Sequence, residues 1–337
     1  MQAHVTSPLL RTGWRRWRLG AICFVAITLT MPAFAQSSPG KSSQPPIMIP
    51  GTTLTGGWAV KTNSFGAPGM PPMPQASGYL TLRVPSAVAA RGNYVYVADS
   101  GHRQIFRYDL SQQSLTPLVG NTNISVSDMA VAADLSLYVA DLNGSKILHF
   151  SVDGRQLQTF SNDLEISRPV AVLVDRHSAN LWVADAIYNH VVVFNSLGRV
   201  IAAQASQMGR SIVAMAQGPD GLYLVDRLSR QVVVVGTDGA EHYSLGKGDL
   251  KMPNAVAVDR YNRVFVSDSF DNTLKVFERG QLVTTVGGGG AIPASFNRIT
   301  SLSIDQATLY VADSLNGRIQ TFHLLAPTRI MAPDDDE

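Results

Sequence analysis

The strongest constraint on the fold is a repeat of about 43 residues that runs through most of the chain. Each copy contains a short β-branched or small apolar run that ends in an aspartate, and the aspartates recur every 41 to 45 residues. They are Asp99, Asp141, Asp185, Asp226, Asp268 and Asp313. A period of roughly 20 to 50 residues is the signature of an architecture in which each unit packs only against its neighbours.

The complete unit reads as four short strands separated by turn residues, as the segment from Pro253 to Gly289 illustrates. Four strands per period indicate one propeller blade, and six periods indicate six blades. Small residues such as Ala87 suit the crowded innermost strands, whereas aromatic residues such as Phe106 follow the aspartate in five of the six copies and fill the wider space further out. The sequence therefore predicts an all-β fold, a six-bladed β-propeller of four-stranded antiparallel blades.

The last copy, from Ile299 to Leu325, contains three strand-like runs and lacks a fourth. Upstream of the first copy, Trp58 to Gly66 has the pattern of an outer strand. An open sheet edge would expose unpaired backbone groups. We therefore expect this N-terminal strand to close the last blade.

The most specific motif is Asp-Ser-Leu-Asn-Gly-Arg-Ile-Gln-Thr-Phe at residues 313–322, which resembles the NHL repeat. The resemblance covers about residues 58–325 and all six copies, although the fourth copy has Val235 where the repeat has phenylalanine. Membership of the NHL-repeat family implies a six-bladed propeller, in agreement with the count of aspartates. The whole is similar to an exported bacterial member of that family.

Residues 1–35 have the features of a secretory signal peptide. Four arginines precede an apolar run from Leu19 to Met31, and Ala33-Phe34-Ala35 is a small-x-small cleavage signal. The apolar run is shorter than the roughly 20 residues of a membrane-spanning helix. We therefore expect cleavage after Ala35, a periplasmic or secreted protein, and no membrane span in the mature chain.

Composition divides the remaining chain into three parts: a flexible linker at 36–57 that is rich in serine and proline, the propeller at 58–326, and an acidic tail at 327–337.

Removing the signal peptide leaves 23 basic and 25 acidic residues, so charge gives no case for nucleic-acid binding. Cys23 is the one cysteine and lies in the signal peptide, which excludes disulfides and thiolate chemistry from the mature chain. We expect a monomer.

The six repeated aspartates are predicted to be structural, accepting backbone hydrogen bonds in the turn between the second and third strands. Residues that carry function should instead break the repeat, and the entry to each inner strand is one place to look. Alignment on the aspartates places Ser86, Asp128, Val170, Ile212, Asn254 and Thr300 there. Connections on the same face carry Arg168, Arg227, Arg298, His102, Tyr188, His190 and Asp271.

Two interpretations of this rim remain open. The polar residues Ser86, Asp128, Asn254 and Thr300, together with Arg168, Arg227 and Arg298, would bind a small polar or anionic ligand such as a sugar or a carboxylate. Alternatively, they hold only water in the central channel.

Three enzyme classes can be compared with these residues. Gluconolactonase-type propellers hold a divalent cation with a first-blade glutamate, an asparagine and an aspartate; Asp128 and Asn254 would supply the last two, but the first blade has no glutamate. A cation such as calcium would bind weakly to a single carboxylate. The amidating lyase built on NHL repeats uses histidine-bound zinc, and no three histidines are predicted to converge. A serine hydrolase is not supported, because the sequence contains no G-x-S-x-G elbow.

Two functions from different classes are therefore carried forward. The first is a non-catalytic binding or scaffold module for a protein or glycan partner, without catalytic residues, cofactor or metal. The alternative is a divalent-cation-dependent hydrolase or lyase, gluconolactonase-like or amidating-lyase-like, with its site around Asp128 and Asn254 at the mouth of the channel. Six intact repeats without a complete catalytic constellation favour the first.

Overall fold

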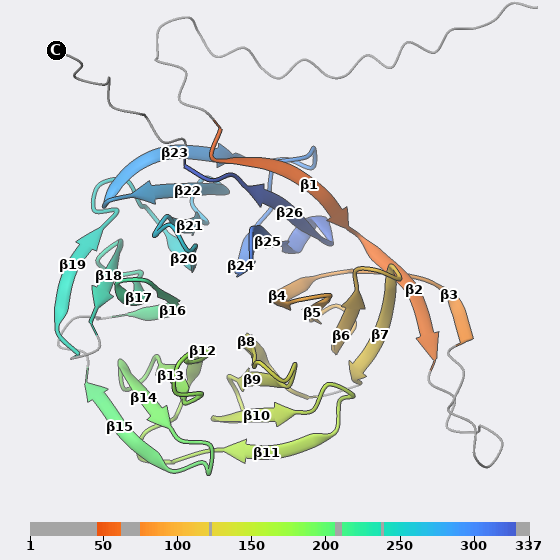
Figure 1. The fold of residues 1–337 in the computed structure, drawn as a ribbon, viewed down its shortest axis with the longest axis horizontal. Helices are drawn as coiled ribbons and strands as arrows, with labels where there is room; N and C mark the ends of the chain where they lie inside the picture. Colours follow the sequence, from red (N-terminus) through yellow and green to blue (C-terminus); the bar gives the residue numbers. More distant parts are fainter. Residues whose placement is uncertain (1–45, 62–74, 121–122, 206–210, 237–238, 328–337) are drawn as a thin grey trace, which may run out of the picture. The chain divides into compact units, whose positions relative to one another are not determined.

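The computed structural model describes residues 46–61, 75–120, 123–205, 211–236 and 239–327. These residues belong to one compact unit, 45–337. Six sheets, each containing a four-stranded antiparallel blade, form a ring around a common axis (Figure 1), which confirms the predicted six-bladed propeller. Within these ranges no helix has the length and hydropathy needed to cross a membrane. The predicted signal peptide and nearly all of the predicted acidic tail lie outside the described residues.

In each blade the first strand lies nearest the axis. Blade 1 contains β4 (Pro85–Arg91), β5 (Tyr94–Asp99), β6 (Gln104–Asp109) and β7 (Ser114–Val119). Blade 2 contains β8 (Val126–Val131), β9 (Leu137–Asp141), β10 (Lys146–Phe150) and β11 (Gln156–Phe160). Blade 3 contains β12 (Pro169–Val174), β13 (Leu181–Asp185), β14 (His190–Phe194) and β15 (Val200–Ala205).

The second half of the ring follows the same order. Blade 4 contains β16 (Ile212–Gly218), β17 (Gly221–Asp226), β18 (Gln231–Val235) and β19 (Glu241–Leu245). Blade 5 contains β20 (Pro253–Val258), β21 (Val264–Asp268), β22 (Thr273–Glu278) and β23 (Gln281–Gly287). Blade 6 contains β24 (Ile299–Asp305), β25 (Thr308–Asp313) and β26 (Arg318–Leu324), with the short 3-10 helix η1 (Ser314–Asn316) between the last two.

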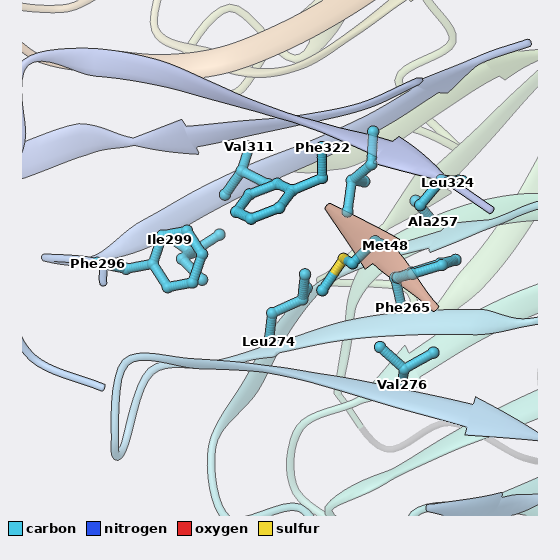
Figure 2. Close-up of a cluster of buried hydrophobic side chains, with 11 residues drawn as sticks. Met48, Ala257, Phe265, Leu274, Val276, Phe296, Ile299, Val311, Phe322 and Leu324 are labelled. Carbon is cyan, nitrogen blue, oxygen red and sulfur yellow. The ribbon is translucent and has the colours of Figure 1, made fainter. Parts of the chain in front are cut away.

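The fourth strand of blade 6 is β1 (Met48–Leu54), which pairs antiparallel with β26. A strand from the N-terminal part of the chain therefore closes the ring. Met48 packs among buried side chains of blades 5 and 6 (Figure 2), whereas Leu54 packs between blades 6 and 1. The closing strand thus fills space in two inter-blade cores and also covers the edge of β26.

The prediction that Trp58 to Gly66 forms this closing strand is wrong. Trp58 lies in β2 (Gly56–Lys61), which pairs in parallel with β7 and antiparallel with β3 (Gln75–Thr81), so that blade 1 becomes a six-stranded sheet. The actual closing strand lies in the stretch whose composition predicts a linker. It contains Pro50 and Gly51, which read as linker residues but are tolerated in an outermost strand.

Side chains connect the inner strands of blades 6 and 1. The backbone N–H of Val88 donates to Ser301 Oγ at 3.2 Å, and the N–H of Ala90 donates to Ser303 Oγ at 3.1 Å. Because both partners advance by two residues in the same direction, β24 and β4 run parallel around the axis. The starts of these two inner strands therefore lie on the same face of the ring.

Candidate functional site

One face of the ring carries the turns between second and third strands and the connections between blades; we call it the connecting face. In every blade the residue after the repeated aspartate donates its N–H to the carbonyl of the residue just before the inner strand, as Ser100 does to Val84 (3.0 Å) and Ser269 to Met252 (3.0 Å). The turn and the connection of each blade are thus held together at this face.

The repeated aspartates are buried and reinforce this junction. Asp99 accepts hydrogen bonds from the backbone N–H groups of Arg83 (2.7 Å) and Val84 (3.1 Å) in the connection, and from His102 (3.0 Å) in the turn. In each of the other five blades the aspartate accepts at least one backbone N–H from the connection or the turn. Because the same arrangement recurs around the ring, these carboxylates serve the fold.

In blade 5 the buried aspartate also has a cationic partner. Lys275 Nζ lies 2.7 Å from Asp268 Oδ2 and donates to the carbonyl of Asp249 at 2.9 Å. Burial alone would raise the pKa of Asp268, but hydrogen bonds from Lys275 and from backbone N–H groups hold that pKa below its ordinary value. A lysine at a third-strand position that is Phe106 in blade 1 is the sequence signal for this pair, which the sequence interpretation missed.

The entry positions of the inner strands differ from the sequence alignment at two places. Each inner strand has a register shift around its second residue. The residues at this shift are Ser86, Ser127, Val170, Val213, Asn254 and Thr300. The prediction is therefore wrong by one residue at Asp128 and Ile212, because the turns between first and second strands differ in length and shift any count made from the aspartates.

Three of these side chains bond to the next blade. Ser127 Oγ donates to the carbonyl of Pro169 (2.8 Å), Asn254 Nδ2 to that of Ile299 (2.7 Å), and Thr300 Oγ1 to that of Pro85 (3.2 Å). In each case the acceptor is the first residue of the neighbouring inner strand. Ser86 stays within its own blade and donates to Ala98 (3.3 Å). Three of the four polar groups at the strand entries therefore link blades.

Asn254 is fully engaged in this way. Its Oδ1 accepts hydrogen bonds from Ser267 Oγ (3.0 Å) and Ser269 Oγ (2.6 Å), in addition to the bond that its Nδ2 makes. A cation at this oxygen would have to displace both hydroxyl groups. Among the residues that the structure describes, no group of three histidine, cysteine, aspartate or glutamate side chains could hold a metal ion.

Asp128 lies one residue deeper in β8 and is half-buried. Its Oδ2 accepts the backbone N–H of Val172 from the inner strand of blade 3 at 3.0 Å. Ser301 accepts the N–H of Val88 in the equivalent place between blades 6 and 1. Burial raises the pKa of Asp128 to about 7, although backbone hydrogen bonds from Val172 and Met129 partly oppose this.

The three predicted arginines stand on different parts of the connecting face. Arg168 and Arg298 lie in connections and are exposed, and their backbone N–H groups bond to Asp185 and to Asn272 Oδ1. Arg227 lies in the turn of blade 4, where its Nε donates to the carbonyl of Pro253 at 3.3 Å. The side chain remains exposed, and its partial desolvation by neighbouring protein atoms lowers its pKa. Ligand binding by these arginines stays a prediction.

A cavity of about 300 Å³ opens on the connecting face between blades 1 and 2. Its lining is Ser86, Ala98, Asp99, Ser100, Arg103, Gln104, Ile105, Asn123, Ile124, Ser125 and Val126. Arg103 donates a hydrogen bond to Asn123 across the junction of the two blades. Ser86 is the one predicted ligand-binding residue in this lining, and Asp99 is one of the predicted structural aspartates. The cavity was not foreseen, because nothing in the sequence showed that this turn and this connection meet.

If the entry residues link blades, removing their hydroxyl groups should affect stability. We expect Ser127→Ala and Thr300→Val each to lower the free energy of unfolding by about 1 kcal/mol, the typical net value of one hydrogen bond. Urea unfolding measures the difference, and Ser229→Ala, in an exposed turn of the same face, is the matched control. Unchanged stability in both variants would contradict the linking role.

Comparison with known proteins supports the fold and leaves the family open. No family model and no curated protein matches the chain. A streptogramin B lyase structure shares 12% identity and a TM-score of 0.54, covering 72% of this chain and 94% of its own. Virginiamycin B lyase from Staphylococcus aureus shares 11% identity and a TM-score of 0.56, and the match covers 72% of this chain and 95% of that one. A protein of unknown function from Bacteroides thetaiotaomicron shares 16% identity and a TM-score of 0.61, and the match covers 72% of this chain and 70% of that one. At these identities the similarity shows a six-bladed propeller, and the NHL assignment stays a prediction.

Proposed function

We propose that the protein is an exported, non-catalytic binding module that presents its connecting face to a protein partner. One observation carries the proposal: three of the four polar side chains at the entries of the inner strands join neighbouring blades. Ser127, Asn254 and Thr300 each donate to the next inner strand, and Asp128 accepts from one. Groups committed to the fold in this way are poorly placed to take part in turnover.

Export rests on the signal peptide predicted for residues 1–35, and NHL membership rests on the motif at residues 313–322. Both belong to this proposal. A propeller suits a binding role because each blade is stabilised by its neighbours, so the turns of one face can vary without loss of the fold.

The proposal is tested by assaying the purified protein for lactone hydrolysis and for cleavage of peptide hydroxyglycines, with and without added calcium, magnesium or zinc. We expect no turnover above the buffer rate and no rise of the melting temperature with any cation. Turnover that disappears in Asp128→Ala, while the variant keeps its fold by circular dichroism, would overturn the proposal.

The second candidate is a divalent-cation-dependent hydrolase or lyase around Asp128 and Asn254. Two observations favour it: burial raises the pKa of Asp128 to about 7, as is common for acid–base groups, and two of the similar solved structures are lyases. Since fold similarity alone does not transfer an activity, this candidate depends on the same assay.

A further inference from the structure

Large exposed apolar side chains gather on the connecting face. Among the described residues, those on this face are Leu164, Ile187, Tyr188, Leu228, Met252, Phe270, Ile292 and Leu315. All eight belong to the turns of blades 3–6 or to the connections that lead into blades 3, 5 and 6. Exposed apolar groups that gather on one side of a protein commonly mark an interaction surface.

Four of these residues occupy one repeat position, two residues after the aspartate. Ile187, Leu228, Phe270 and Leu315 are 53–66% exposed, whereas blades 1 and 2 have Gly101 and Asn143 there. The six turns share one backbone form, because the fourth residue after each aspartate is left-handed, with φ of 50–62°. The apolar tips therefore project from equivalent places on four adjacent blades. The fold does not require an apolar residue at this position, because blades 1 and 2 form the same turn without one.

The charge around these tips is mainly positive. In the described turns and connections of blades 3–6 the exposed basic residues are Arg168, Arg227, Arg230, Lys247, Lys251 and Arg298, against the exposed acids Asp163 and Asp249. The side chains of Glu165 and Asp271 are 31% and 35% exposed, and Asp271 lies 3.4 Å from the buried Lys275. Basic and apolar groups are interleaved, since Lys251 Nζ lies 4.5 Å from the centre of the Phe270 ring. A partner with apolar groups alone would leave these cations unmatched.

This charge distribution decides between occupants. In a symmetric dimer through this face, two surfaces with the same excess of positive charge would meet, which opposes association. A lipid surface would match the basic residues, but inserting Leu164, which is 82% exposed, would bring Asp163 against lipid phosphates. An acidic polypeptide can place its charges where the arginines and lysines lie and its apolar side chains against the tips.

We infer that the connecting face over blades 3–6 binds a polypeptide segment in which large apolar side chains alternate with acidic ones. The inference rests on the proposed binding function and names its surface and partner chemistry. The four tips supply apolar area that becomes buried when the peptide binds. The basic residues between them attract the acidic peptide and give the binding its specificity.

Three fluorescein-labelled peptides of equal length test the inference by fluorescence anisotropy. The first alternates glutamate or aspartate with leucine or phenylalanine; the second has lysine in place of the acids; the third has serine in place of the apolar residues. We expect the first to bind at least about tenfold more tightly than the others. Leu228→Ser/Phe270→Ser should weaken it at least about tenfold, and Lys251→Glu should weaken it most at low salt.

Matched variants on the opposite face provide the controls. Leu197→Ser removes an apolar side chain that is 73% exposed, and Arg155→Glu reverses an exposed charge; neither should change the affinity. Equal affinity for all three peptides, or no binding of the first, would overturn the inference. Binding to phosphatidylglycerol vesicles, or dimerisation in sedimentation velocity, that is lost in the Leu228→Ser/Phe270→Ser variant would overturn it in favour of a membrane or a second copy. None of these outcomes depends on the turnover assay. A failure of the peptide-binding inference can therefore be distinguished from a failure of the proposed non-catalytic function.

Discussion

A disulfide between positions 49 and 323 is expected to raise the free energy of unfolding by about 3–5 kcal/mol. Ile49 and His323 are directly opposite each other in β1 and β26, and both are exposed, so neither belongs to the core. Opposite residues in antiparallel strands have Cα atoms about 4.5–5.5 Å apart, within the range of a disulfide. The bridge would join the two ends of the ring and constrain an unfolded loop that spans the whole propeller.

Urea unfolding of Ile49→Cys/His323→Cys, oxidised and then reduced, measures the effect. The reduced form and Ile49→Cys alone are the controls, and Cys23 is the one natural cysteine, within the predicted signal peptide.

Deletion of residues 48–54 should instead destabilise the protein by several kcal/mol, because it exposes the edge of β26 and empties the places of Met48 and Leu54. If the oxidised pair formed no bridge, the assignment of β1 as the closing strand would fail.

The same strand shows what the sequence could predict about the fold. The number of blades followed from the aspartates, because each is needed in its own blade to hold a turn against a connection, and so the repeat is visible in the sequence. The closing strand has no such marker. An outermost strand pairs on one edge only and tolerates Pro50 and Gly51, so its sequence resembles a linker.

The candidate site was less predictable for a different reason. Whether a polar residue faces a ligand or a neighbouring blade depends on strand register, and turns of unequal length moved Asp128 one residue from its predicted place. The apolar tips could have been found from the sequence, since Leu228 and Phe270 follow their aspartates by the same two residues as Gly101 does. Their exposure, however, depends on the conformation of the turns, which the spacing alone did not define.

Replacing Asp128 by asparagine is expected to stabilise the propeller by about 1–3 kcal/mol at pH 8 and to have little effect at pH 4. Burial raises the pKa of Asp128 to about 7 in the folded protein, above the value of about 3.9 in an unfolded chain. The folded state therefore binds the proton more tightly, so the wild type loses stability as the pH rises from about 4 to about 7, and this loss is complete above that range. Asparagine keeps an acceptor for the N–H of Val172 without placing a charge at this half-buried position.

Urea unfolding of the wild type and Asp128→Asn between pH 4 and pH 8 measures the difference. Ser301→Ala is the matched control, because Ser301 accepts the equivalent N–H of Val88 but does not titrate in this range; it should cost about 1 kcal/mol at every pH. A pH-independent loss of stability in Asp128→Asn would show that the carboxylate is ionised and favourably bonded in the folded protein. An ionised carboxylate that costs stability is better explained by a proton-transfer role than by a structural one. If asparagine stabilises the protein and the wild type shows measurable turnover, the two results together would favour the hydrolase or lyase. Stabilisation without turnover would leave Asp128 as a link between blades 2 and 3.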